Sequence, residues 1–423
     1  SIQFGLTDQF ITPLALFLGA NKVTIGMLSF IRNALASIVQ INSAELTHWF
    51  GSRKKFLTTS VLIAALLWLP TYFLPFFFDK LRMPVFIVFF ALTSCFNLIA
   101  TPAWASLVAE HIPFRKRGQY FGFRAAVLGV VYFISLLLAG LLLHAFERFD
   151  LFLGFAILII LASVSRLLSW GSLAQMYEPK WRPRTEYSFT FWAFVRRLPV
   201  SNFARYAVFS AFFMMSVALV SPFFAVYILS ELGFSYFPYA VLTAGTILTT
   251  FVTQRYWGWF ADRYGNLRII GLTTALISIV PLLWLFSKSF FYLLVIQLLA
   301  GFLWAGFNLS SVNFIYDVAV SGKRERCIAY FNFLSGAGLG IGALAGGFLY
   351  RHLPPIGGSS FFSLLVISAC ARFIFAQLIS LFTKEVRQVH PIRPQMLLLD
   401  ITGVRALGLM SKELLVTIRR GLE

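Results

Sequence analysis

The chain has 423 residues, of which 59% are hydrophobic and only 12% are charged, and its mean hydropathy is +0.81. A single soluble core could not bury that much apolar surface, so the composition excludes a soluble globular domain and indicates a protein whose main solvent is lipid. The formal net charge of +19 would suit a nucleic-acid partner, but the positions of the basic residues argue against one.

Continuous apolar runs predict twelve membrane-spanning helices. The runs are close to the roughly 20 residues that an α-helix needs to cross the hydrocarbon layer, and they lack the alternation of membrane barrel strands. An even number of spans places both termini on the same side of the membrane. In chain order, to within several residues, the predicted spans are 2–19, 23–49, 56–77, 84–109, 119–143, 151–176, 202–230, 237–260, 268–287, 290–318, 327–350 and 360–383.

The basic residues of the loops gather on one side of the predicted membrane. They include Arg53, Arg115, Arg182, Arg263 and Arg324, whereas the loops of the other side hold few. By the positive-inside rule the basic side is the cytoplasm, so we expect an integral protein of the cytoplasmic (inner) membrane with both termini inside. The excess charge then reflects topology and contact with anionic lipids, and no nucleic-acid partner is expected.

The second half of the chain repeats landmarks of the first at a separation of about 210 residues. Phe96-Asn97-Leu98 recurs as Phe307-Asn308-Leu309, Thr12-Pro13 as Ser221-Pro222, and Arg166 as Arg372. The repeat predicts two related six-helix bundles, residues 1–177 and 201–384, joined by a cytoplasmic linker over residues 178–200. In the cytoplasmic tail, residues 385–423, the apolar spacing predicts an amphipathic helix on the membrane surface, and a docking site for a protein partner stays open.

Two loops carry related motifs. The loop after the eighth span has the pattern Gly-x-x-Ala-Asp-Arg-x-Gly, with Gly258, Asp262, Arg263, Gly265 and Arg268. The loop after the second span keeps Gly51 and Arg53 but has His48 where the pattern has Asp. In these residues the chain resembles the major facilitator superfamily of secondary transporters over its whole length apart from the tail. The resemblance implies an all-α integral membrane fold of two pseudo-twofold-related six-helix bundles, which alternate access to a central cavity and whose motif loops form the cytoplasmic gate.

The resemblance also places the cavity between the two bundles, lined mainly by the first, fourth, seventh and tenth spans. Polar side chains of these spans are the candidate solute-binding residues: Thr12, Asn97, Trp304, Asn308 and Ser311. Polar residues in lipid normally face protein or water, so these should point inward, although hydrogen bonding between helices would explain each of them as well.

Asp8 and Arg32 are charged residues inside predicted spans. Counted from the loop between the first two spans, they lie about 18 Å and about 15 Å deep on adjacent antiparallel helices, so we expect them to pair. Pairing would offset the cost of burying each charge, and protonation of Asp8 or an anionic solute at Arg32 would open the pair. A purely structural pair and an ion-coupling or solute-binding site both stay open.

No grouping of residues predicts an enzyme, a cofactor or a metal site. The histidines lack Cys or carboxylate partners at ligand spacing, and Cys95, Cys327 and Cys370 lie far apart in sequence. The leading hypothesis is a secondary active transporter of a small organic solute, driven by protons through Asp8; a transport-inactive assembly or scaffold protein with the same fold and a lipid or lysolipid transporter are the alternatives. The first residue is Ser, so a short N-terminal stretch is expected to be missing, and no cleavable signal peptide is recognisable.

Overall fold

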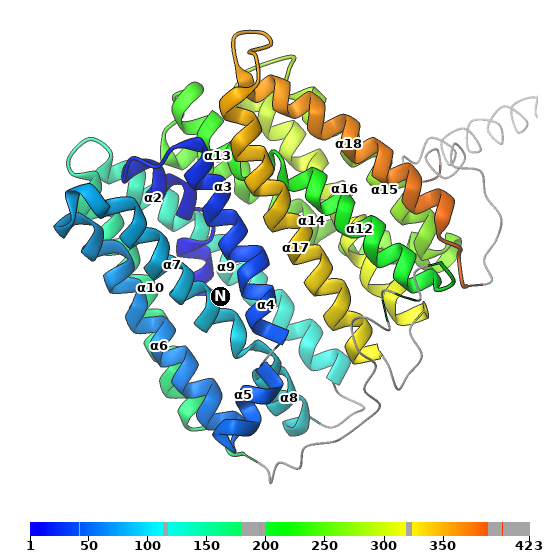
Figure 1. The fold of residues 1–423 in the computed structure, drawn as a ribbon, viewed down its shortest axis with the longest axis horizontal. Helices are drawn as coiled ribbons and strands as arrows, with labels where there is room; N and C mark the ends of the chain where they lie inside the picture. Colours follow the sequence, from blue (N-terminus) through cyan, green and yellow to red (C-terminus); the bar gives the residue numbers. More distant parts are fainter. Residues whose placement is uncertain are drawn as a thin grey trace, which may run out of the picture.

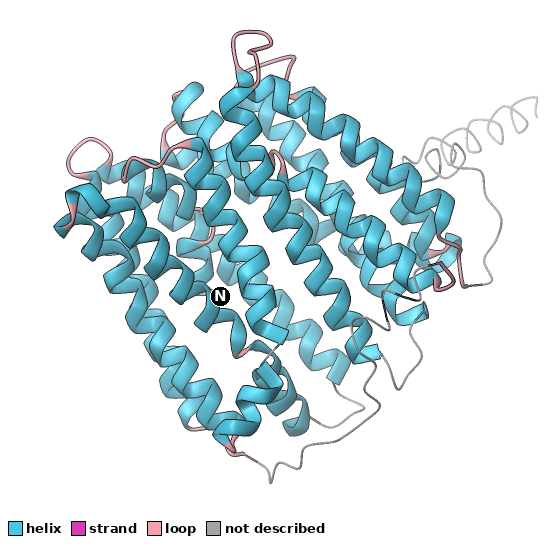
Figure 2. Cartoon of the chain, viewed as in Figure 1, coloured by secondary structure: helices cyan, strands magenta, loops and turns pink. Residues whose placement is uncertain are grey.

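The computed structural model describes residues 1–41, 43–112, 117–178, 194, 196, 199–318, 324–387 and 400, and most of them are helical (Figure 2). Among these residues, 11 helices are long and apolar enough to cross a membrane. The predicted linker over residues 178–200 and the predicted amphipathic helix of the tail lie largely outside the described residues. The prediction of an all-helical membrane protein is confirmed.

The helices α1 to α10 form what we call the N half. The second predicted span is subdivided because a π-helical segment, η1, lies within it, and the fourth is subdivided because its helix breaks at Ala100. The elements are α1 (Ile2–Thr7), α2 (Ile11–Phe17), α3 (Lys22–Phe30), η1 (Ile31–Leu35), α4 (Ala36–Ile41), α5 (Ser43–Phe50), α6 (Arg53–Phe73), η2 (Leu74–Phe77), η3 (Asp79–Leu81), α7 (Arg82–Ile99), α8 (Thr101–His111), α9 (Arg117–Phe146) and α10 (Leu151–Ala174).

The helices α12 to α18 form the C half. Its first predicted span, the seventh of the chain, is subdivided into the long helix α12 and three short elements, and the others are single helices. The elements are α12 (Asn202–Ala218), η5 (Ser221–Phe223), α13 (Phe224–Val226), η6 (Tyr227–Glu231), α14 (Tyr236–Tyr264), α15 (Asn266–Leu283), α16 (Phe290–Val318), α17 (Arg324–His352) and α18 (Ser360–Phe382).

The first span of each half is broken, and a proline explains both breaks. Proline has no backbone N–H, so the carbonyl four residues before it loses its helical donor. Pro13 removes the donor for Gln9, and the chain turns at residues 8–10 between α1 and α2. Pro222 does the same for Ala218, where α12 ends. The two breaks therefore follow from the repeated proline. Because of the first break, the first predicted span is not among the 11 helices that are long enough to cross a membrane.

The two halves lie side by side and meet along two helix pairs (Figure 1). The N-terminal part of the second span, α3 and η1, packs against α17, and α9 packs against α14. Small residues permit the close approach: a Cβ at Gly26 would lie 2.5 Å from the carbonyl oxygen of Ala343, and one at Gly140 would lie 2.3 Å from the Cβ of Ala240. Helices α14 and α17 thus flank the side of the C half that faces the N half.

Helix α17 is also fixed within its own half by a ridge of glycines. A Cβ at Gly338 or Gly342 would lie 2.1–2.3 Å from a backbone carbonyl oxygen of α12, and one at Gly346 would lie 2.0 Å from the carbonyl oxygen of Leu219, directly after α12. Their four-residue spacing places them on one face of the helix, as the sequence indicates. The ridge therefore serves close packing between α12 and α17.

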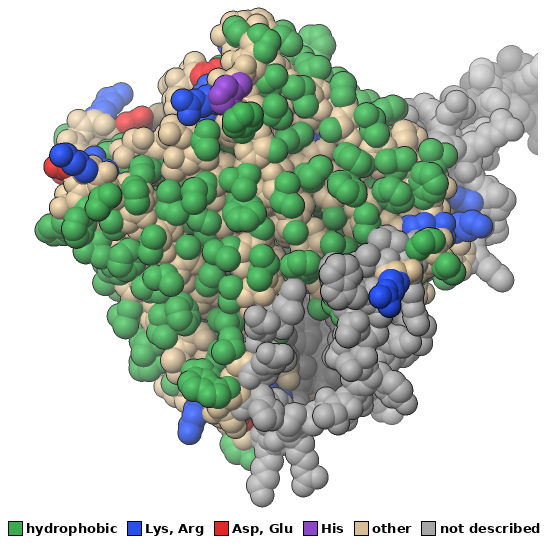
Figure 3. Space-filling model, in the orientation of Figure 1, with side chains coloured by type: hydrophobic (Ala, Val, Ile, Leu, Met, Phe, Trp, Pro, Cys, Tyr) green, Lys and Arg blue, Asp and Glu red, His purple; other side chains and the backbone are tan. Residues whose placement is uncertain are grey.

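A broad apolar band crosses the face of the molecule seen in Figure 3, and the charged side chains visible on this face lie at the edges of the band. We call the end that contains Gly51 and Gly265 the motif face, and the end where α17 ends and α18 begins the opposite face. The apolar band is the surface that a lipid bilayer would cover.

Candidate functional site

Asp8 and Arg32 form an ion pair, as their depths predict. The Arg32 guanidinium donates from Nη2 to the Asp8 carboxylate at 3.0 Å and from Nη1 to the Asp8 backbone carbonyl, also at 3.0 Å. The side chain of Arg32 is 38% exposed and that of Asp8 is 24% exposed, so the pair is open to a solute or to protons. Arg32 lies in the π-helical segment η1, and such segments occur frequently at functional sites.

Three side chains that no sequence motif marks complete the surroundings of the break between α1 and α2. The Gln9 side chain donates to the hydroxyl of Tyr132 on α9 at 3.3 Å. The hydroxyl of Tyr239 on α14 donates to the backbone carbonyl of Gln9 at 2.8 Å. Because Tyr239 belongs to the C half, the site joins both halves. The signal for Gln9 was Pro13, which removes the helical donor for that carbonyl, whereas nothing in the sequence pointed to either tyrosine.

Asn308 lies on the face of α16 that its own half leaves uncovered. The neighbouring Gly306 packs against α14 and α15, and Phe307 packs against Phe213 of α12 at a ring distance of 5.5 Å. Asn308 points away from these contacts and is exposed, and Trp304, one turn earlier, is partly exposed. The face of α16 that its own half leaves open therefore carries the polar side chain of Asn308 and the indole of Trp304.

Two of the predicted solute contacts, Asn97 and Ser311, are buried in this structure. Asn97 is only 9% exposed and donates to the backbone carbonyl of Thr93 at 3.0 Å, on the face of α7 where Thr93 meets Thr71 of α6 at 3.0 Å. Ser311 is 4% exposed, one turn before Phe314, which packs on α12. Both side chains are buried in this structure, each on a helix face that packs inside its own half, and their contact with a solute stays a prediction. Thr12 is partly buried, next to the break.

The threonines of α14 have a structural role. Thr243 and Thr253 donate to carbonyls one turn back on the same helix, whereas Thr246 and Thr250 donate to carbonyls of α16. The two bonds to α16 hold the helices together, and all four hydroxyl protons are engaged with the backbone.

The motif of the C half is bound to residues that follow α18. Arg387 donates from Nη1 to Asp262 at 3.1 Å and from Nε to Asp317, at the end of α16, at 2.7 Å. The hydrogen bond with Asp317 is the main reason why the pKa of Arg387 is raised, so the guanidinium stays charged. Glu385 accepts the N–H of Leu267 at 2.7 Å and so caps the start of α15.

The other members of this motif shape the same loop. Gly265 has a φ of 93°, a conformation that favours glycine, and it ends α14. Arg263 lies 5.3 Å from the ring of Trp259, and Arg268 donates to the carbonyl of Tyr264. Gly258 contacts Leu309 of α16. These contacts all stay within the C half.

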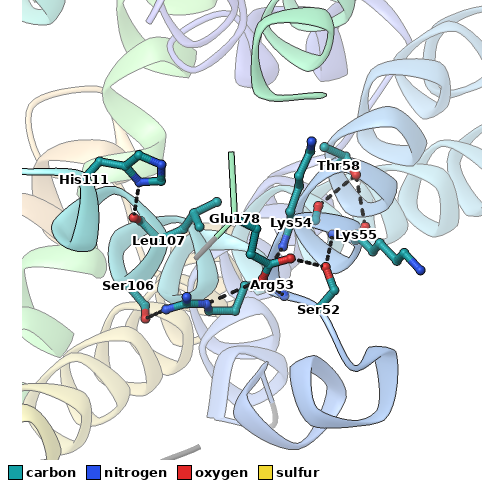
Figure 4. A network of polar contacts seen from close by, with 9 residues as sticks. All are labelled: Ser52, Arg53, Lys54, Lys55, Thr58, Ser106, Leu107, His111 and Glu178. Carbon is teal, nitrogen blue, oxygen red and sulfur yellow. Dashed lines mark hydrogen bonds and ion pairs between the residues drawn. The ribbon is translucent and has the colours of Figure 1, made fainter. Parts of the chain in front are cut away.

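The motif of the N half has a parallel construction (Figure 4). Glu178, after α10, accepts the backbone N–H groups of Arg53 at 2.8 Å and Lys54 at 3.3 Å at the start of α6. The Arg53 side chain is 2% exposed, faces Glu178 at 3.7 Å and donates to Ser106 of α8 at 2.9 Å. Gly51 has a φ of 64° at the turn that precedes α6. Each half therefore ties its motif loop to its own last helix.

Contacts between the halves continue at the opposite face. The ammonium of Lys22, at the start of α3, lies 3.6 Å from the centroid of the Tyr350 ring on α17. The Tyr350 hydroxyl donates to Glu231, and Glu231 also accepts from Ser359 at 2.6 Å. A cation over an aromatic face is attracted by its quadrupole. Lys22 and Tyr350 therefore hold the halves together at this face.

Arg166 and Arg372 occupy corresponding helices but have different surroundings. Arg372 is 4% exposed and donates to the backbone carbonyls of Val217 at 3.3 Å and Ile277 at 3.5 Å. Arg166 lies 5.9 Å from the ring of Phe4. Arg372 thus links α18 to α12 and α15, a structural role.

Two helical bundles lie side by side, and the broken first span, which carries Asp8, lies close to both of them. This arrangement is typical of a membrane transporter fold. The family model "Major Facilitator Superfamily" matches residues 2–216 and 206–412, so the chain belongs to this superfamily of transporters, which are not enzymes. No curated protein matches the chain.

Solved structures share the fold at low sequence identity. A D-xylose-proton symporter is similar with a TM-score of 0.71 and 13% identity over 92% of this chain and 95% of its own. A bacterial homologue of the iron transporter ferroportin in an inward-facing state has a TM-score of 0.69 and 14% identity over 90% and 95%. The nucleoside transporter NupG has a TM-score of 0.62 and 16% identity over 90% and 96%.

Proposed function

We propose that this superfamily member moves a small organic solute by alternating access and couples the movement to protons through Asp8. The observation that carries the proposal is the Asp8–Arg32 pair at the break of the first span, partly exposed and linked to the C half through Gln9 and Tyr239. An ionisable residue inside a membrane span is costly, and it marks an ion or solute pathway by default.

Protonation of Asp8 would act on one of the two bonds that Arg32 makes. A neutral carboxyl group no longer attracts the guanidinium, so the bond to the side chain weakens. The bond to the backbone carbonyl of Asp8 does not depend on that charge and keeps Arg32 close to the break. Proton binding would therefore loosen η1 from α1 and α2 without expelling a charge into lipid, which is a suitable step for alternating access.

The groups around the site favour an uncharged polar solute. Thr12, Trp304 and Asn308 offer hydrogen-bonding groups and one indole ring, and none of them is charged. Two of the similar structures are described as a nucleoside transporter and a D-xylose-proton symporter. We therefore propose a neutral, hydroxyl-bearing solute such as a sugar or a nucleoside.

We propose that the protein lies in the cytoplasmic membrane, with the motif face and both termini on the cytoplasmic side. The basic loops support it, since Arg53 and Arg263 lie at the motif face. The contacts at Lys22, Tyr350 and Tyr239 then fit a form that is closed toward the outside.

The test is solute uptake by proteoliposomes with the outside more acidic than the inside. Uridine, adenosine, D-xylose and D-glucose form the first panel. Replacing Asp8 with Asn should abolish uptake driven by the pH gradient and spare exchange of solute across the membrane. Asp79→Asn is the matched control, because Asp79 is 86% exposed at the opposite face. Undiminished gradient-driven uptake by Asp8→Asn would remove Asp8 from the mechanism. Failure to transport any solute, together with stable co-purification in a larger complex, would instead favour the scaffold alternative.

A further inference from the structure

The break in the first span leaves two successive carbonyls that need donors from elsewhere. The carbonyl of Asp8 receives Arg32 from η1 of the same half. The carbonyl of Gln9, which Pro13 deprives of its helical N–H, receives the hydroxyl of Tyr239 from the C half at 2.8 Å. One short turn is therefore held by both halves at adjacent peptide groups.

The position of Tyr239 depends on the contact between α9 and α14. Tyr239 is 5% exposed, and its ring lies edge-on to Phe10 at 6.0 Å, immediately after the break. The next residue, Ala240, occupies the space beside Gly140, where a Cβ would lie only 2.3 Å away. The Tyr239–Gln9 bond can form only while the two helices are this close, so it is made in one arrangement of the halves and lost when they separate.

The same turn carries the charge pair. Asp8 and Gln9 are consecutive, and among the side chains that the structure describes, Arg32 on η1 and Tyr132 on α9 are the other titratable groups near Asp8. A change at the Asp8–Arg32 pair would alter the turn, and the turn includes the Gln9 carbonyl to which the Tyr239 hydroxyl donates. In lipid a backbone carbonyl that loses its hydrogen-bond donor costs free energy. Arg32 and Tyr239 therefore both influence the conformation of the turn at Asp8 and Gln9.

We infer that Tyr239 is a positioning residue through which the C half responds to the state of the Asp8–Arg32 pair. Its hydroxyl stabilises the form in which α9 and α14 are closed, and it does so through the backbone of the turn rather than by touching solute. The inference rests on the proposed function of Asp8, which it deepens by naming the residue of the other half that completes the coupling.

The experiment measures how far the halves separate, and so needs no solute. Spin labels on cysteines at Phe149 of the N half and Phe286 of the C half, both at the opposite face, report the distance between the halves. They are introduced into the full chain after replacement of Cys95, Cys327 and Cys370 by Ser. Electron paramagnetic resonance then gives the populations of the closed and separated forms in liposomes.

Tyr239→Phe should raise the ratio of separated to closed molecules about fivefold, the size of effect expected for one net hydrogen bond. Tyr236→Phe is the matched control, with the same chemical change one turn away on α14, where the ring packs on Phe155. It should leave the ratio unchanged. Gly140→Ala should shift the ratio in the same direction, because its methyl group would push α9 and α14 apart while the Tyr239 hydroxyl is kept. This variant still tests the inference if Tyr239→Phe fails to fold.

A double-mutant cycle with Asp8→Asn separates the inference from the proposed function. If Tyr239 responds to the pair, the effect of Tyr239→Phe in the Asp8→Asn background should fall to less than half of its effect alone. Equal effects in both backgrounds, or an equal shift with Tyr236→Phe, would overturn the inference and make Tyr239 a packing residue. Proton coupling is measured independently, in the uptake assay. The role of Tyr239 and the role of Asp8 in coupling can therefore be rejected or supported separately.

Discussion

The carboxylate of Glu178 gives the sharpest stability prediction. Glu178→Ala removes the acceptor of two backbone N–H groups at the start of α6, those of Arg53 and Lys54. A hydrogen bond to a charged group contributes about 1.5 kcal/mol or more, so the two together predict a loss of about 3 kcal/mol in the stability of the N half. Glu178→Gln keeps an acceptor oxygen but loses the favourable charge at the helix start and opposite the Arg53 guanidinium, so it should cost at least about 1 kcal/mol and less than Glu178→Ala.

The C half supplies an internal comparison for the same physical argument. Glu385 accepts one N–H at the start of α15, that of Leu267, so Glu385→Ala should cost about half as much as Glu178→Ala. Glu147 forms a partly exposed contact with His144, for which at most about 1 kcal/mol is expected.

Thermal unfolding of the purified protein in detergent, followed by tryptophan fluorescence, tests this order. The midpoint should fall most for Glu178→Ala, less for Glu385→Ala and least for Glu147→Ala. If Glu178→Ala unfolds at the same temperature as Glu147→Ala, the helix starts at the motif face are not held by these carboxylates, and the parallel between the two halves has no energetic meaning.

Three further predictions concern the contact between the halves, the helix packing and the solute face. Lys22→Ala removes a cation–π contact of about 1 kcal/mol, so labelling of a cysteine near the opposite face should increase about fivefold in rate; an unchanged rate would count against this contact. Gly342→Ala places a Cβ 2.1 Å from a carbonyl oxygen of α12 and should lower the unfolding midpoint by several degrees, whereas Gly171→Ala, which has nothing within 4 Å, should not. Asn308→Leu should weaken solute binding about tenfold in a calorimetric titration, and Asn97→Leu should leave it unchanged because Asn97 is buried inside the N half. Equal effects of the last two would contradict the assignment of the solute face.

The sequence was sufficient for features that depend on one helix or on simple counting. Span positions follow from apolar length, and the Asp8–Arg32 pair follows from two depths measured from one loop. The motif loops follow from Gly51 and Gly265, whose positive φ values favour glycine.

Features that depend on contacts between distant segments could not be predicted in this way. The partner of the Gln9 carbonyl comes from residue 239, and nothing local to Tyr239 distinguishes it from the other tyrosines of the chain. The echo between Asn97 and Asn308 was misleading for a similar reason. A match of three residues fixes their order along a helix, but which face packs inside the half depends on neighbours, and α7 ends two residues after Asn97. Glu178 and Glu385 were missed because each acts on a loop more than a hundred residues earlier.

The two halves share a plan but differ where the site lies, and the difference bears on mechanism. Both first spans break ahead of a proline, yet the break of the N half carries Asp8 whereas that of the C half falls at Ala218 and Leu219, which are apolar. An ionisable group is needed to bind a proton, but a neutral face suffices to hold an uncharged solute. In the function proposed above, the charge of the site lies on one half and its neutral polar face, at Trp304 and Asn308, lies on the other, so a proton and a solute would share one site only when the halves are together. Occupancy by both would then depend on the arrangement of the halves, and this dependence would couple the two movements.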